Sequence, residues 1–247
     1  MATDKFRGIG AHLKDVWRGT ASKKVYGIYI LVPLAIYWAG VAVAAAVYPG
    51  GFSMLTVYVS YLGGYPNNPN GYIIYNTLTF IAGILLAPHF LYLYRRLMPT
   101  LKVFSVLSGF FGIVGAFGLA TLGFWYQGVP GPWHAVATYL AFGGLGAGLT
   151  FAFFVFLRKL WLRQPWPKWW QIAILYGIIL AIVGVATLFT NATNLLQGLN
   201  VNPAFLEDRF WEWFYLFAVL IGIIGVYLIA PSEVGTSVSK DKSGRNG

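Results

Sequence analysis

Six apolar runs follow one another along the chain, and each is as long as a membrane-spanning helix. A hydrocarbon core about 30 Å thick needs about 20 apolar residues per helix. The runs lie near residues 25–48, 71–94, 103–126, 133–157, 169–190 and 210–230. Proline, glycine and charged residues separate them. The pattern predicts an all-α fold, a polytopic membrane bundle of six transmembrane helices that occupies residues 25–230.

The segments that flank this membrane domain are polar. Residues 1–24 combine basic charges with apolar side chains at roughly helical spacing, which predicts an amphipathic segment on the cytoplasmic face of the membrane. A solvated basic tail is the alternative. Residues 231–247 are rich in Ser, Lys and Gly, a composition typical of a disordered cytoplasmic tail.

The basic residues are distributed very unevenly between the two ends of the predicted helices. If both termini lie in the cytoplasm, every one of the 17 Lys and Arg residues except Arg209 lies in a cytoplasmic segment. Cytoplasmic loops of membrane proteins carry such an excess, so the sequence predicts a multi-pass protein of the cell membrane with both termini inside. The formal net charge of +10 then indicates attraction to anionic lipid head groups, and no nucleic-acid partner is expected.

Composition and motifs exclude several classes of site. Hydrophobic residues make up 58% of the chain and charged residues only 10%, so nothing is left to form a soluble domain. With 0 Cys the sequence has no disulfide framework, thiolate metal site or cysteine nucleophile. The nucleotide-binding glycine motifs and the hydrolase motifs HExxH and GxSxG are absent as well. We predict no metal and no cofactor, and expect bound lipid.

Glycine recurs at helical spacing within two of the predicted spans. Small residues let helix backbones approach each other closely in lipid, where no hydrophobic effect drives association. The pattern therefore predicts packing surfaces rather than ligand sites. The glycines concerned are Gly109, Gly112, Gly115 and Gly118 in the third span and Gly144 and Gly148 in the fourth.

A few polar residues lie at the exterior ends of the spans or in the first exterior loop, 49–70. They are candidates for function because polar groups are costly in a membrane. The loop itself is expected to run as a short extended stretch followed by turns. Since the residues in or beside the spans lie at similar depth, we expect them to line one outward-facing pocket. The candidates for binding a lipid or a partner are Ser60, Asn68, Asn76, His134, Asn191, Asn194 and Glu212.

Three residues carry chemistry that a hydrolase or transferase would need. Asp208 and Glu212 are four residues apart and share a helix face, where two carboxylates repel each other unless a cation or a shared proton relieves them. With His134 they could form an acid/base pair or a carboxylate–imidazole metal site. The alternative, which the sequence favours, is that the acidic residues stabilise the N-terminus of the last helix.

Another histidine, His89, lies about 20 Å deeper than the exterior candidates. We interpret it as an interior histidine beside a backbone carbonyl that Pro88 has released from the helix. A contact with a lipid or quinone head group is the alternative.

The first exterior loop resembles that of a known family. It reads Tyr58-Val59-Ser60-Tyr61-Leu62-Gly63, followed by Asn68-Pro69 and, in the next helix, Asn76. This order of residues is similar to that in the DUF998 family and the related Frag1/DRAM/Sfk1 six-span proteins. His134 and Glu212-Trp213 would be the matching positions in later helices. The resemblance implies a six-helix fold and a role in lipid or lipid-anchor remodelling or in organising membrane components.

Three functions remain open. The first, favoured by the abundant packing residues, is an accessory or scaffold subunit of a membrane assembly, with other membrane-protein subunits as partners. The second is binding or remodelling of a lipid through the outward-facing pocket. The third is a membrane hydrolase or transferase that uses His134 with Asp208 and Glu212.

Overall fold

The computed structural model describes residues 8–162 and 208–229, and the regular elements within these ranges are all helices. The predicted span at 169–190 and the predicted tail at 231–247 lie outside the described residues. The elements are α1 (Ile9–Arg18), α2 (Lys23–Ala46), the short 3₁₀ helix η2 (Val59–Gly63), α3 (Tyr72–Leu97), α4 (Lys102–Leu122), α5 (Trp133–Trp161) and α7 (Asp208–Ile229).

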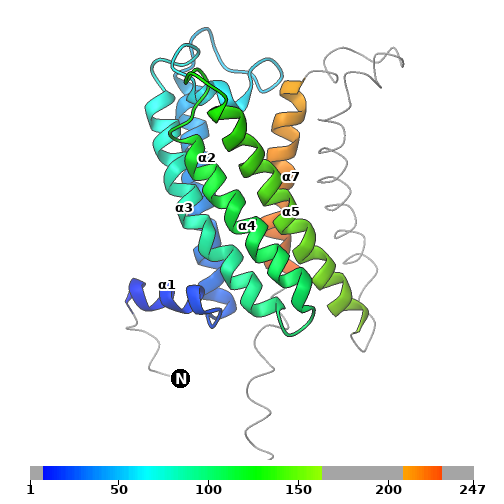
Figure 1. Ribbon diagram of the computed structural model, residues 1–247. Coiled ribbons are helices and arrows are strands. Elements are labelled where there is room, and N and C mark those ends of the chain that lie inside the picture. The colour runs from blue at the N-terminus through cyan, green and yellow to red at the C-terminus, as the bar shows by residue number, and fades with distance from the viewer. Residues whose placement is uncertain (1–7, 163–207, 230–247) are drawn as a thin grey trace, which may run out of the picture.

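Four of these helices, α2 to α5, are long and apolar enough to cross a membrane. The described apolar part of α7 is shorter, Glu212–Tyr227. Helices α2 and α4 run in one direction and α3, α5 and α7 in the other, so one end of the bundle gathers the start of α7 and the loops before α3 and α5 (Figure 1). The all-helical class is confirmed for the described part of the chain. The count of six spans and the cytoplasmic position of both termini stay predictions.

The predicted glycine surfaces hold α4 against α5. A Cβ added at Gly144 of α5 would lie 2.5 Å from the backbone nitrogen of Gly115 of α4, and one at Gly148 would lie 2.7 Å from the Cα of Gly112. Real side chains essentially never approach so closely, so the two backbones touch only because both positions lack side chains. The prediction of packing surfaces is confirmed for these glycines.

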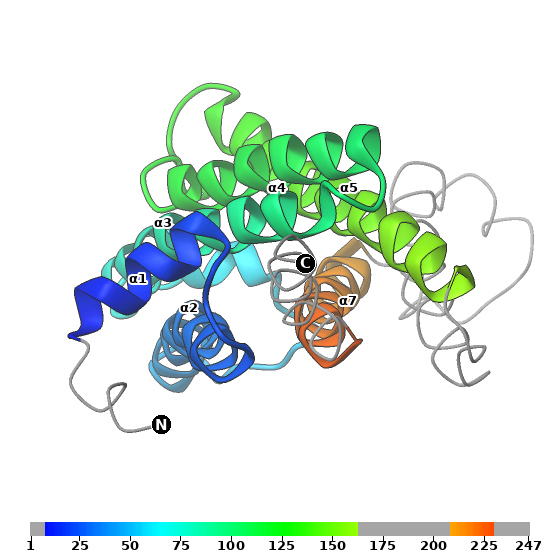
Figure 2. The same ribbon diagram turned by 90° about the horizontal axis from the view of Figure 1, so that it is seen from below.

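Helix α1 lies across the end of the bundle at which α2 begins (Figures 1 and 2). Val16 is its buried contact with the bundle, whereas Ile9 and Trp17 are exposed. The turn into α2 is tied to the end of α3, because Arg96 donates a hydrogen bond to the Ala21 carbonyl oxygen at 3.2 Å. Within the expected amphipathic segment, Ile9–Arg18 form helix α1, and the position of the segment on the cytoplasmic face stays a prediction.

The interior position of His89 is confirmed, but its expected partner is not. His89 is fully buried, and its Nδ1 lies 2.7 Å from the hydroxyl oxygen of Tyr26 on α2. The partner is therefore a side chain from a neighbouring helix and not a carbonyl released by Pro88, since the tyrosine hydroxyl reaches the ring where the two helices pack.

The first exterior loop also differs from its prediction. The extended stretch expected around residues 56–60 is replaced by a turn followed by η2. The alternation of polar and apolar residues suggested a strand, but no neighbouring strand pairs with it among the described residues. The loop backbone instead bonds to side chains of α7, and this arrangement builds the site below.

Candidate functional site

The first turn and a half of α7 holds the exterior loop in place. Trp213 donates its indole N–H to the Val57 carbonyl oxygen at 2.8 Å, and Arg209 donates to the Thr56 carbonyl oxygen at 2.6 Å. The carboxylate of Glu212 accepts a hydrogen bond from the Val59 backbone N–H at 3.0 Å. Positions 209, 212 and 213 share one face of a helix, so a single face of α7 binds residues 56–59.

Glu212 is a buried carboxylate with only 6% of its surface exposed. Burying such a group is costly unless hydrogen-bond donors satisfy it. Ser60 supplies further contacts through both its backbone and its side chain, beside the Val59 amide. The amides that begin η2 thus take the place of water around this carboxylate.

Helix α3 joins the same loop from the other side. Asn76, which is 6% exposed, donates its side-chain N–H to the Gly63 carbonyl oxygen at 2.9 Å. A side chain at Gly63 would collide with the Asn76 amide, so the close approach requires glycine. The adjacent Tyr75 shares a hydrogen bond of 3.2 Å with the hydroxyl of Tyr37 on α2.

These side chains surround a small cavity, which we call the outer chamber. Its volume is about 20 Å³. It brings together four of the seven predicted binding residues, namely Ser60, Asn76, His134 and Glu212. The complete lining is Tyr37, Val59, Ser60, Gly63, Tyr75, Asn76, Leu119, Leu122, Tyr126, Gln127, His134, Thr138, Phe142 and Glu212.

His134 reaches the outer chamber from the first turn of α5. Its Nδ1 lies 2.8 Å from the Trp125 carbonyl oxygen. A carbonyl can only accept, so Nδ1 carries the proton. In the neutral ring Nε2 is then the nitrogen with a lone pair, and it can accept a hydrogen bond from a ligand.

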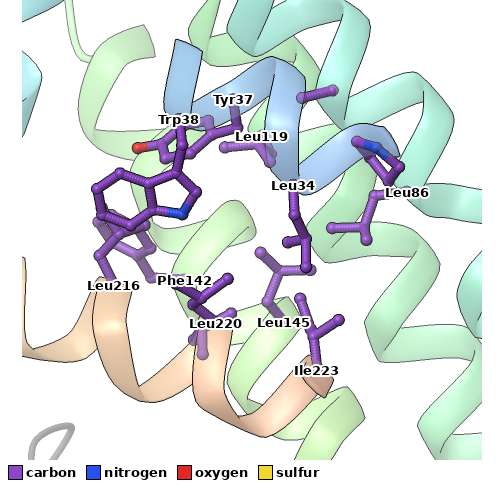
Figure 3. Close-up of a pocket in the computed structure, with 13 residues that line it drawn as sticks. Leu34, Tyr37, Trp38, Leu86, Leu119, Phe142, Leu145, Leu216, Leu220 and Ile223 are labelled. Carbon is purple, nitrogen blue, oxygen red and sulfur yellow. The ribbon is translucent and has the colours of Figure 1, made fainter. Parts of the chain in front are cut away.

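A second cavity, the inner chamber, lies deeper in the bundle. Its volume is about 40 Å³, and its wall is almost entirely apolar, with residues of α2, α3, α4, α5 and α7 (Figure 3). Tyr37, Leu119 and Phe142 line both chambers. The half-buried side chains of Leu34 and Trp38 border it on α2 and that of Leu220 on α7. The two chambers together therefore form a polar compartment at the end of the bundle and an apolar one towards its middle.

Asn68, another of the predicted binding residues, does not line the outer chamber. It is fully buried and donates to the carbonyl oxygens of Ala44 and Leu62, at 3.0 and 3.1 Å. Its own side-chain oxygen accepts from the Gly71 N–H at 3.2 Å. All three of these hydrogen bonds are with backbone atoms, so Asn68 joins the end of α2, η2 and the start of α3.

Replacing Asn68 by alanine is therefore expected to lower the free energy of unfolding by about 2–3 kcal/mol, because each of three hydrogen bonds contributes about 1 kcal/mol. The melting temperature of the detergent-solubilised protein measures the change. Asn70→Ala is the matched control, since Asn70 is exposed in the same loop. Equal melting temperatures for the two variants would contradict this role of Asn68.

The remaining candidates are placed only in part. Asn191 and Asn194 lie outside the described residues. Asp208 begins α7, one turn before Glu212, and the structure describes its backbone but not its side chain. Within the described part of the chain, no group of three or more His, Asp or Glu residues is arranged to hold a metal ion.

Sequence reasoning missed several polar residues of the outer chamber. Thr138 lies one helical turn after His134, and Tyr75 directly precedes Asn76. Their spacing from these two candidates could have indicated that they line the same cavity. Tyr37 had no such signal. It lies in the middle of an apolar span, and only the packing of α2 against α3 brings its hydroxyl to that of Tyr75.

Comparisons of the chain with protein-family models, with curated proteins and with solved structures give no match. The resemblance to the DUF998 and Frag1/DRAM/Sfk1 proteins therefore stays a prediction. The structure supports a broad class of protein and no particular family. The apolar helices are compatible with an integral membrane protein.

Proposed function

We propose that the protein binds an amphiphile of the membrane whose polar end is a hydroxyl or an amine. The observation that carries this proposal is that the two chambers are neighbours and share three wall residues, Tyr37, Leu119 and Phe142. A polar compartment next to an apolar one matches a molecule with a polar end and a hydrocarbon chain. This function develops the lipid-binding hypothesis of the sequence.

The charge of the residues around the outer chamber favours one kind of polar end on the ligand. Glu212 lies in the outer chamber, and none of the described residues that line this chamber is lysine or arginine. A phosphate would find no lysine or arginine in this lining to bind it. A hydroxyl or an ammonium group, in contrast, can donate hydrogen bonds to the carboxylate and to Nε2 of His134.

The volume of the outer chamber favours the same class of ligand. A cavity needs about 10–15 Å³ to hold one water molecule, so the outer chamber, at about 20 Å³, has room for one such group. A phosphate with its several oxygens is too large. The inner chamber takes the first carbons of the chain, and the rest continues between α2 and α7, where Leu34, Trp38 and Leu220 are only half-buried.

The other two functions stay predictions. A scaffold or accessory role depends on partner proteins, which nothing in the described residues identifies. A hydrolase or transferase would need His134 and the carboxylates to act together on a substrate. In the structure each group is engaged by the backbone of another segment, Glu212 by Val59 and His134 by Trp125.

Photo-crosslinking tests the proposal. The full chain in phosphatidylcholine nanodiscs is labelled with a diazirine analogue of 1-hexadecanol, and unlabelled compounds of the same chain length compete. We expect hexadecanol and hexadecylamine to compete and hexadecyl phosphate to be at least tenfold weaker. His134→Phe is expected to reduce labelling about tenfold, because one hydrogen bond to the ligand, of about 1–1.5 kcal/mol, is lost.

Tyr139→Phe is the matched control. Tyr139 lies on the same helix, is 72% exposed and does not line the chamber, so labelling should stay at the wild-type level. If hexadecyl phosphate competes as well as hexadecanol, or if His134→Phe labels like Tyr139→Phe, the proposed ligand class is wrong.

A further inference from the structure

A wide groove lies at the other end of the bundle, where α1 crosses the first turns of α2. We call it the interfacial groove. Its volume is about 660 Å³, within the range of about 300–1,000 Å³ that is usual for small-molecule sites. Its lining residues are Ile9, His12, Leu13, Val16, Ser22, Lys24, Val25, Ile28, Tyr29, Val32, Pro33 and Leu85.

The side of the groove formed by α2 is charged at one end and apolar along the rest. Lys24, Ile28 and Val32 follow one another at intervals of four residues, so they form a stripe on one face of the helix. From Lys24 to Pro33 the helix rises about 14 Å. This length is close to half of a hydrocarbon core about 30 Å thick, so the stripe extends across one leaflet.

The side formed by α1 is apolar and open. Ile9 and Leu13 line the groove, although 81% and 45% of their surfaces are exposed. Val16, one turn after His12, is fully buried and fixes α1 on the bundle. A helix that lies across the bundle end with its apolar face uncovered is typical of the boundary between lipid head groups and hydrocarbon chains.

The polar rim of the groove is basic. Lys24 and His12 line it, and Lys14, Arg18 and Lys23 are the other basic residues between positions 8 and 24. The one acidic residue in that stretch is Asp15, which accepts a hydrogen bond from the Thr20 hydroxyl at 3.4 Å. Basic residues at a membrane surface attract anionic lipids, and a lysine that contacts the lipid phosphate adds about a fivefold gain in affinity.

We propose that the interfacial groove binds one anionic phospholipid of the adjacent leaflet. Its phosphate lies at Lys24, and one acyl chain follows Ile28 and Val32 down α2. The sequence places this end of the bundle in the cytoplasm. The site is independent of the outer chamber, which lies at the opposite end of the bundle and carries a carboxylate instead of a lysine.

Native mass spectrometry of the full chain, titrated with palmitoyl-oleoyl phosphatidylglycerol or phosphatidylcholine, tests the head-group contact. Wild-type protein should prefer phosphatidylglycerol, and Lys24→Gln should reduce that preference about fivefold. Lys14→Gln makes the same change of charge at an exposed position outside the groove and should have a much smaller effect. Equal effects of the two variants, or no preference in the wild type, would overturn the proposal.

A pair of tryptophan variants tests the acyl-chain contact. Val32→Trp fills the groove, whereas Leu31→Trp adds the same side chain at an adjacent position that is 58% exposed and does not line it. We expect Val32→Trp to remove at least four fifths of the bound phosphatidylglycerol and Leu31→Trp to retain it. Glycerol 1-phosphate should not displace the lipid. Displacement by it, or wild-type binding in Val32→Trp, would show that no acyl chain occupies the groove.

Discussion

Gly144→Ala is expected to lower the melting temperature of the protein by about 10 °C, while Gly143→Ala leaves it within about 2 °C of the wild-type value. At Gly144 the added methyl group would lie 2.5 Å from the Gly115 nitrogen, 2.6 Å from the Gly115 Cα and 2.9 Å from the Phe111 carbonyl oxygen. These are backbone atoms, and no flexible side chain can move aside. Helices α4 and α5 must therefore separate.

Overpacking of a core typically costs about 1–3 kcal/mol, and we expect the upper end of that range here. In a protein of this size about 3 kcal/mol corresponds to a melting shift of about 6–12 °C. Gly143 is a matched control because it is the adjacent residue of the same helix and nothing lies within 4 Å of a Cβ there. Thermal melting in detergent, followed by size-exclusion chromatography, measures both. Equal shifts would show that the backbone contact between α4 and α5 does not limit stability.

Glu212→Ala is expected to release the exterior loop from α7. The substitution removes the acceptor of the Val59 N–H and the contacts with Ser60, which leaves buried donors without a partner. Hydrogen bonds to a charged group are worth about 1.5–3 kcal/mol. Amide hydrogen exchange of residues 56–63 should then become about 100-fold faster, since 1.4 kcal/mol is a factor of ten in an equilibrium.

Two further variants make this measurement specific. Glu212→Gln keeps one side-chain oxygen that can accept from Val59, so exchange should rise less than in Glu212→Ala. Ile221→Ala truncates an exposed side chain on the same helix and should not change exchange in the loop. If Glu212→Ala exchanges like the wild type, the carboxylate does not hold the loop, and the outer chamber must be kept closed by other contacts.

The four long apolar helices α2 to α5 could be predicted from the apolar pattern, with boundaries that shift by a few residues. The second span was expected at 71–94 and is found at Tyr72–Leu97, and the third was expected at 103–126 and ends at Leu122. The length of each apolar run predicts a helix because a helix that crosses a lipid core needs about 20 apolar residues. The ends are set by local contacts that hydropathy does not contain, such as the Thr121 carbonyl oxygen that accepts from the Trp125 N–H.

The candidate site could be predicted only in part. Depth in the membrane follows from position along a helix, so Asn76, His134 and Glu212 were correctly expected to meet. Asn68 lies in the first exterior loop and is also polar, but it bonds to the backbone and does not line the cavity. The direction of a loop side chain depends on the fold of the loop, and the alternating pattern around Thr56 predicted a short extended stretch where the structure forms a turn and η2.

The sequence by itself determined that the chain is built of apolar helices, that glycines make two of them pack closely and that polar groups gather at one end. Each of these follows from the periodicity of a single segment and from the cost of polar groups in lipid. Only the tertiary structure decided that Glu212 binds the backbone of η2, that Tyr37 reaches the polar cavity and that this cavity shares wall residues with an apolar one. These features depend on contacts between distant residues, such as Val59 and Glu212, which are 153 positions apart, and no local pattern encodes them.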